Sequence, residues 1–134
     1  MTKFTDTVLI VEDEALIALG LQMQVEDMGL NVCDIAATAD DAISLARIHK
    51  PAVVLMDMRL RGVGDGVDAA LSIYETIGSK VIFVTGSREP ATIDRIKLDH
   101  PSAILFKPVS QEELADAITA ARASIDRADM AVSV

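Results

Sequence analysis

Aromatic residues and cysteine are both scarce in this sequence. The 134 residues include three Phe, one Tyr and no Trp, so aromatics make up 3% of the chain. A flavodoxin-like electron carrier needs aromatic side chains to stack its flavin, and this composition disfavours that class. Cys33 is the only cysteine and has no partner for an internal disulfide. Because it lies within an apolar run, we expect a buried structural thiol.

Basic residues are also few, since 12 Lys and Arg stand against 21 Asp and Glu and leave a net charge of −9. Nucleic acids and anionic membranes attract basic surfaces, so this balance disfavours both as partners. No apolar run approaches membrane-spanning length, and no basic region precedes a long apolar stretch near the first residues. We therefore expect a cytoplasmic protein that is neither exported nor inserted into a membrane.

Short apolar runs alternate with helical patterns along the chain. This alternation predicts an α/β fold in which helices cover both faces of a doubly wound parallel sheet. The length suits one domain, which we place at residues 1–126, followed by a flexible tail at 127–134. The expected strands are Thr7–Val11, Asn31–Ala36, Ala52–Met56, Lys80–Thr85 and Ala103–Phe106.

Helices are expected between and after these strands. The first should end at Gly29 and carry an apolar side formed by Ala15, Leu16, Leu19, Met23 and Val25. The glycines within residues 61–66 predict a flexible loop before the third helix. The helix expected between Pro90 and Pro101 contains the mostly charged run Asp94-Arg95-Ile96-Lys97-Leu98-Asp99, so it has little apolar surface with which to dock.

Polar residues stand where four of the expected strands end. Glu12 and Asp13 follow the first strand, Asp57 follows the third, Thr85 ends the fourth and Lys107 follows the fifth. In parallel sheets such ends meet at one edge, where ligands bind. Three carboxylates there repel one another unless a divalent cation lies among them. With a hydroxyl and an ammonium group added, the set suits phosphoryl transfer to a nucleophilic Asp57.

Each of these residues also has an ordinary role when taken alone. A single Asp after a strand is usually a turn or cap residue, and Glu12 and Asp13 suit the N-terminus of a helix. Thr85 fits the strand itself, and Lys107 is typical of a solvated surface. Coincidence at four strand ends is improbable, so we favour the functional interpretation.

The motifs around these residues resemble those of response-regulator receiver domains (CheY-like) of bacterial two-component signalling. They are Val-Glu-Asp-Glu at 11–14, Leu-Met-Asp-Met-Arg-Leu at 55–60, Val-Thr-Gly at 84–86 and Phe-Lys-Pro at 106–108. Four motifs in this order are much more specific than one, and the resemblance extends over most of the sequence. It implies the flavodoxin-like (βα)5 receiver fold with strand order 2-1-3-4-5.

The resemblance also implies a role for each site residue. Asp57 would accept a phosphoryl group from the phosphohistidine of a histidine kinase. Asp13, Asp57 and the backbone carbonyl of Arg59 would bind Mg²⁺ or another divalent cation directly, and Glu12 would bind it through water. Thr85 and Lys107 would hold phosphoryl oxygens, and the Lys107–Pro108 bond would be cis. Such a protein is a phosphoacceptor and not an enzyme, beyond catalysing its own phosphorylation and dephosphorylation.

Two stretches depart from the commonest receiver pattern. Ile104 stands three residues before Lys107, where the family usually has an aromatic residue that rotates inward on activation. The sequence therefore leaves open whether this chain uses the familiar threonine–aromatic coupling. Phe83-Val84-Thr85-Gly86 is partly similar to the FAT GUY subgroup of alphaproteobacterial receivers, which work with HWE-type kinases. The polar helix that follows has two interpretations, a static surface helix or one that orders on phosphorylation.

Partners follow from the same resemblance. Because the receiver pattern fills the sequence, we expect a stand-alone, single-domain response regulator acting as a phosphate sink, a relay intermediate or an allosteric regulator. The donor would be a histidine kinase, of the HWE type for the subgroup, with a histidine phosphotransferase or downstream regulator as further candidates. The binding face would lie around Arg95, Ile104 and Phe106. A monomer and a weak homodimer both remain open.

Two other classes of protein, in addition to the flavin carrier, share features with this sequence. Haloacid-dehalogenase-like phosphatases also use a strand-end Asp with Mg²⁺, Thr and Lys, but they need a second acid where this chain has Arg59. That arginine has a functional interpretation, shielding or stabilising a phosphoryl group, and an ordinary one as a solvated loop residue. A receiver-shaped interaction module that no longer needs phosphate is the stronger rival, and the intact acceptor set argues against it.

Overall fold

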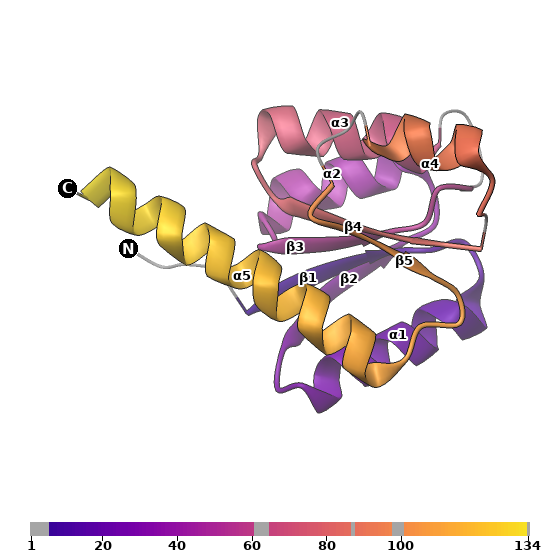
Figure 1. Cartoon of the computed structure of the whole chain (residues 1–134), viewed down its shortest axis with the longest axis horizontal. Helices are drawn as coiled ribbons and strands as arrows, with labels where there is room; N and C mark the ends of the chain where they lie inside the picture. Colours follow the sequence, from indigo (N-terminus) through magenta and orange to yellow (C-terminus); the bar gives the residue numbers. More distant parts are fainter. Residues whose placement is uncertain (1–5, 61–64, 87, 98–100, 134) are drawn as a thin grey trace.

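In the computed structural model, the described residues are 6–60, 65–86, 88–97 and 101–133, with side chains described up to Ile125. They form one parallel five-stranded sheet with the order β2-β1-β3-β4-β5, which confirms the predicted topology (Figure 1). The strands are β1 (Thr7–Val11), β2 (Asn31–Ala36), β3 (Val53–Met56), β4 (Lys80–Thr85) and β5 (Ala103–Phe106). The helices are α1 (Ala15–Asp27), α2 (Ala39–His49), α3 (Gly66–Thr76), α4 (Pro90–Lys97) and α5 (Gln111–Ser133).

The core has two layers because successive side chains of a strand point to opposite faces of the sheet. In β1, Leu9 and Val11 pack with α2, α3 and α4. Val8 and Ile10 pack with α1 and α5 on the other face. Figure 1 shows these two helix groups on opposite sides of the sheet. Since both faces are covered, the central strands β1 and β3 are buried along their whole length, as their continuous apolar runs predict.

The edge strand β2 is more exposed and irregular. Its pairing with β1 shifts between Val8 and Leu9, which pair with Val32 and Asp34, so Cys33 is the extra residue of a bulge. Such bulges are common at sheet edges. Cys33 is half-buried, whereas the sequence predicted a buried thiol. This partial burial raises the pKa of the Cys33 thiol.

The predicted apolar side of α1 is wrong at most positions. Ala18, Leu21 and Val25 face the core, whereas Leu16, Leu19 and Met23 are 84%, 51% and 59% exposed. Both sets are spaced at three and four residues, so each forms a continuous stripe along a helix. The spacing of apolar residues does not show which of the two stripes is buried. The packing of α1 against the sheet and α5 determines it.

The C-terminal helix is longer than the sequence predicts. The expected domain ends at residue 126, but the backbone of α5 continues as helix to Ser133. Its last turns extend away from the body of the molecule (Figure 1). The flexibility proposed for residues 127–134 stays a prediction.

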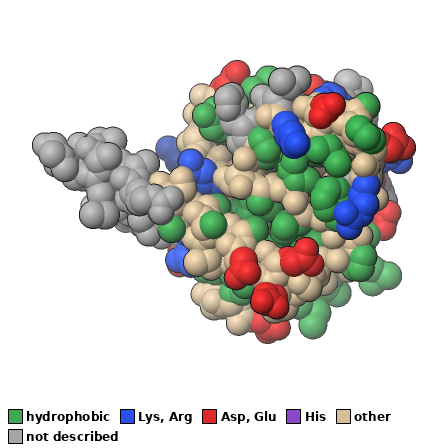
Figure 2. All heavy atoms as spheres, viewed as in Figure 1, with side chains coloured by type: hydrophobic (Ala, Val, Ile, Leu, Met, Phe, Trp, Pro, Cys, Tyr) green, Lys and Arg blue, Asp and Glu red, His purple; other side chains and the backbone are tan. Residues whose placement is uncertain are grey.

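The surface mixes residue types. On the face shown in Figure 2, acidic and basic side chains are interspersed among apolar and other polar ones. None of the helices in the described ranges combines the length and apolar character needed to cross a membrane.

Candidate functional site

Parallel pairing brings the predicted polar residues together at the carboxyl edge of the sheet. The backbone N–H of Asp57 donates to Val11 O at 2.9 Å, and that of Lys107 donates to Thr85 O at 2.9 Å. These bonds tie the end of β3 to β1 and the end of β5 to β4. Glu12, Asp57 and Thr85 are all buried. The five strand-end residues of the sequence prediction therefore meet at one site.

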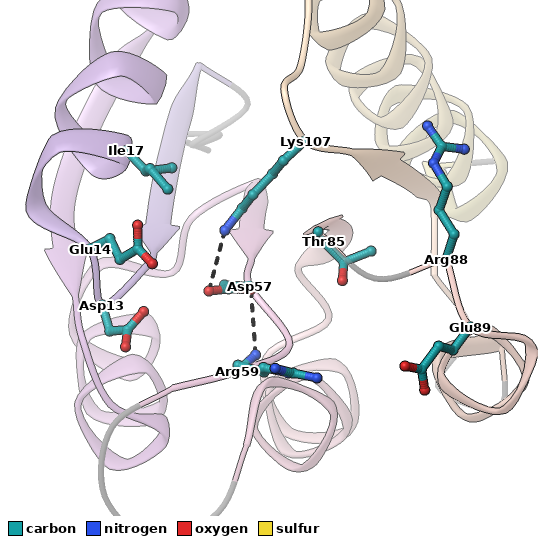
Figure 3. A pocket seen from close by; sticks show the side chains of 10 residues that line it. Asp13, Glu14, Ile17, Asp57, Arg59, Thr85, Arg88, Glu89 and Lys107 are labelled. Carbon is teal, nitrogen blue, oxygen red and sulfur yellow. Dashed lines mark hydrogen bonds and ion pairs between the residues drawn. The ribbon is translucent and has the colours of Figure 1, made fainter.

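A hollow of about 650 Å³ opens at this edge. Its wall includes four predicted residues, Asp13, Asp57, Thr85 and Lys107, with Arg59 on the rim, and Glu12 lies buried beside Asp57. Figure 3 shows Asp57 in the middle, with Lys107 on one side and the backbone of Arg59 on the other. A ligand entering the hollow would therefore meet the Asp57 carboxylate.

Three carboxylates form a cluster with the chemistry of a cation site. Glu12, Asp13 and Asp57 each offer one oxygen, and these oxygens lie within 4.8 Å of one another. Oxygen ligands of this kind suit hard divalent cations such as Mg²⁺. Burial and the charge of Glu12 raise the pKa of Asp57 to about 6, so its carboxylate is destabilised by its surroundings. A bound cation would offset this electrostatic destabilisation. The three oxygen donors therefore fit Mg²⁺.

Lys107 places a positive charge beside two of the three carboxylates. Its Nζ lies 2.6 Å from Glu12 Oε1 and 3.5 Å from Asp57 Oδ2. Burial opposes the charged form of Lys107, but the hydrogen bond to Glu12 and the charge of Asp57 outweigh it and raise the lysine pKa. Burial likewise opposes the charge of Glu12, but Lys107 and the backbone N–H of Glu14 lower its pKa. At neutral pH, Lys107 is therefore held between two carboxylates.

The raised pKa of Asp57 predicts a pH-dependent stability of the metal-free protein. An unfolded Asp titrates near 3.9, so the folded state favours protonated Asp57, and this contribution is present below about pH 4 and lost as pH rises through about 6. We expect the free energy of unfolding, relative to Asp57→Asn, to fall by about 2 to 3 kcal/mol across that window. Urea unfolding at pH 4 and pH 7 measures it. A difference that stays constant with pH would contradict the assigned shift.

Arg59 lies on the rim of the hollow with an exposed side chain. Its backbone N–H is 3.4 Å from Asp57 Oδ1, a long hydrogen bond that still holds the loop beside the carboxylate. The expected metal contact of its carbonyl stays a prediction. The Lys107–Pro108 bond is cis, as expected.

Five other residues line the hollow, and the sequence assigned none of them a role in the site, although Glu14 and Gly86 belong to the motifs that carry the resemblance. They are Glu14, Ile17, Gly86, Arg88 and Glu89. Glu14 and Ile17 follow the acidic pair Glu12 and Asp13 along the chain, and only this proximity in the sequence could have indicated that they line the hollow. The guanidinium of Arg88 lies 4.2 Å from the ring centroid of Phe106, a cation–π distance. In Figure 3 the Arg88 side chain points away from Asp57.

Gly66 was also missed, because the sequence suggested only loop flexibility for this region. It is the first residue of α3 and is buried. Its N–H donates to Met58 O at 2.8 Å, and a Cβ at this position would lie 1.9 Å from the backbone oxygen of Asp57. Close approach of two backbones, and not flexibility, therefore requires glycine here. The rest of the predicted loop, residues 61–64, lies outside the described residues.

Comparisons with known proteins agree with this geometry. The family model of the response regulator receiver domain matches residues 8–119. The transcriptional regulatory protein PdtaR of Mycobacterium tuberculosis is 33% identical over 111 residues, which cover 83% of this chain and 54% of that protein. The phyllosphere-induced regulator PhyR of Methylorubrum extorquens is 39% identical over 83 residues, covering 61% of this chain and 31% of PhyR. This chain thus spans about half of PdtaR and less of PhyR.

Solved structures show the same fold. The signal receiver domain of a modulated diguanylate cyclase from Desulfovibrio desulfuricans G20 superposes with a TM-score of 0.84 at 33% identity. The match covers 88% of this chain and 94% of that one. The similarity therefore extends over most of this chain.

Proposed function

This chain belongs to the response regulator receiver domain family, and from that membership we propose that Asp57 is its phosphoacceptor. The observation that carries the proposal is the meeting of Glu12, Asp13, Asp57 and Lys107 at one edge of the sheet. In the proposed reaction, a carboxylate oxygen of Asp57 attacks the phosphorus of a kinase phosphohistidine. The P–N bond breaks as the acyl phosphate P–O bond forms.

The surrounding residues have separate parts in this proposal. When bound, Mg²⁺ neutralises charge on the phosphoryl oxygens. Asp13, Asp57 and the Arg59 carbonyl would hold the ion, with Glu12 reached through water. Lys107 would turn from its carboxylate partners to a phosphoryl oxygen, and the hydroxyl of Thr85 would donate to another. Each of these groups already lies at the edge of the hollow or beneath it.

We propose a histidine kinase as the phosphoryl donor, acting in the cytoplasm. The partial FAT GUY similarity suggests a kinase of the HWE type and stays a prediction. The phosphorylated domain would act as a sink, pass the group to a histidine phosphotransferase, or regulate a downstream protein, as a monomer or weak homodimer. The rival proposal is an interaction module that works without phosphate.

The proposal is tested by incubating the chain with Mg²⁺ and acetyl phosphate and locating the modification by mass spectrometry. We expect one phosphoryl group, on the peptide that contains Asp57, and no labelling when EDTA removes the cation. A receiver of known activity, treated in parallel, shows that the conditions suffice. If that receiver is labelled and Asp57 is not, the phosphate-independent module becomes the better interpretation.

A further inference from the structure

Helix α4 is held to the rest of the protein by few apolar contacts. Ile96 is its one buried residue, completely shielded from solvent. The charged run noted in the sequence accounts for this, because charged side chains do not enter the core. Polar contacts must therefore contribute to the position of α4.

Arg95 makes such a contact with the start of α3. Its guanidinium donates two hydrogen bonds to the carboxylate of Asp65, from Nη1 to Oδ2 and from Nη2 to Oδ1, the second at 3.3 Å. Nη2 also lies 3.5 Å from Asp68 Oδ1. A bidentate pair fixes orientation as well as distance. Arg95, expected in the partner-binding face, is thus directed at α3.

Asp65 is also the N-cap of α3. Its Oδ1 accepts from the backbone N–H groups of Val67 at 3.0 Å and Asp68 at 3.1 Å. Partial burial opposes the charge of Asp65, but the hydrogen bonds from Arg95 and the backbone of Asp68 outweigh it and lower the pKa of Asp65. A single carboxylate therefore joins α4 to the first turn of α3.

That first turn is in direct contact with the proposed phosphoacceptor. The next residue, Gly66, donates its N–H to Met58 O and packs against the backbone of Asp57 so closely that no Cβ would fit. The contacts therefore run without a break from Arg95 through Asp65 and Gly66 to Asp57.

We propose that Arg95 is a positioning residue, which sets the backbone of Asp57 through Asp65 and Gly66. The inference rests on the proposed function for its meaning, but its first test needs no phosphoryl transfer.

The test compares Arg95→Gln with Lys97→Gln, which removes the same charge from an exposed position of the same helix. In metal-free protein, we expect Arg95→Gln to accelerate hydrogen exchange of the Gly66 amide by about three- to fivefold, the size suited to a partly exposed ion pair. The Mg²⁺ dissociation constant, from calorimetric titration, should rise by a similar factor of about three. Lys97→Gln should change neither quantity.

Asp65→Asn separates positioning from simple loss of stability. Asn caps helices as well as Asp does, so this change removes the charge of the pair and keeps the cap. If Arg95 acts through Asp65, the double variant should show about the effect of one single variant. Arg95→Lys, which keeps the charge without the forked geometry, should fall between wild type and Arg95→Gln.

The outcomes separate the two proposals. If Arg95→Gln behaves like Lys97→Gln, or if its effect adds to that of Asp65→Asn, the positioning role is overturned. If the expected changes in exchange and Mg²⁺ affinity occur but wild-type Asp57 is never labelled, the positioning role of Arg95 stands and the phosphoacceptor function fails.

Discussion

Replacing Asp57 with Asn should abolish phosphoryl labelling and make the metal-free protein more stable at pH 7. Asn has nearly the shape of Asp but cannot form an acyl phosphate, so the nucleophile is lost while the site keeps its volume. The gain in stability arises because burial and Glu12 raise the pKa of Asp57 to about 6, which makes its ionised form costly at neutral pH. We expect about 2 to 3 kcal/mol, and Mg²⁺ should reduce the difference by stabilising the wild type.

Asp116→Asn is the matched control for this substitution. Asp116 lies exposed on α5, so its replacement removes the same charge far from the cluster. We expect labelling at the wild-type level and a change in the free energy of unfolding within about 0.5 kcal/mol. Labelling of Asp57→Asn at the wild-type rate would refute the assignment of the acceptor. A less stable Asp57→Asn variant would refute the electrostatic description of the cluster.

The sequence predicted the strand-end residues correctly because two simple rules determine them. Apolar runs mark buried parallel strands, and the carboxyl ends of parallel strands meet at one edge. Asp57, Thr85 and Lys107 each come directly at or after such a run, so their meeting follows from the topology alone. Their distances and pKa shifts depend on side-chain packing, which the pattern of apolar residues does not contain.

The features missed from the sequence depend on packing between elements. Leu16, Leu19 and Met23 form as regular a stripe as the residues that α1 buries, so periodicity could not identify the sheet-facing side. The pairing of Arg95 with Asp65 joins residues thirty positions apart. No local pattern indicates such a contact, because exposed Arg and Asp are common on helix surfaces.

The residues near Ile104 also needed the structure. Ile104 pairs with Phe83 in the sheet and packs against the cluster of α2, α3 and α4. Phe106, two residues further along β5, is aromatic, and the guanidinium of Arg88 lies 4.2 Å from its ring centroid. This cation–π contact involves Phe106 and not position 104, so it does not test the question of threonine–aromatic coupling.

Replacing Gly66 with Ala should damage both the fold and the site. The added Cβ would lie 1.9 Å from Asp57 O and 2.9 Å from the Cα of Met58, and these are backbone atoms that cannot rotate away. Relieving such a clash costs typically about 1 to 3 kcal/mol, observable as a lower urea midpoint. Because the backbone of Asp57 must move, we also expect labelling to slow by about a hundredfold, the order seen for misplacements near 1 Å.

Gly20→Ala is the matched control and should have the opposite effect on stability. Gly20 lies in the interior of α1, and a Cβ there would meet no atom within 4 Å. Alanine should therefore stabilise the helix by about 0.5 to 1 kcal/mol and leave labelling unchanged. Since the two substitutions are chemically identical, any difference between them arises from the surroundings. If Gly66→Ala is as stable and as readily labelled as Gly20→Ala, α3 does not press on Asp57, and the contact that links Arg95 to the acceptor is absent in solution.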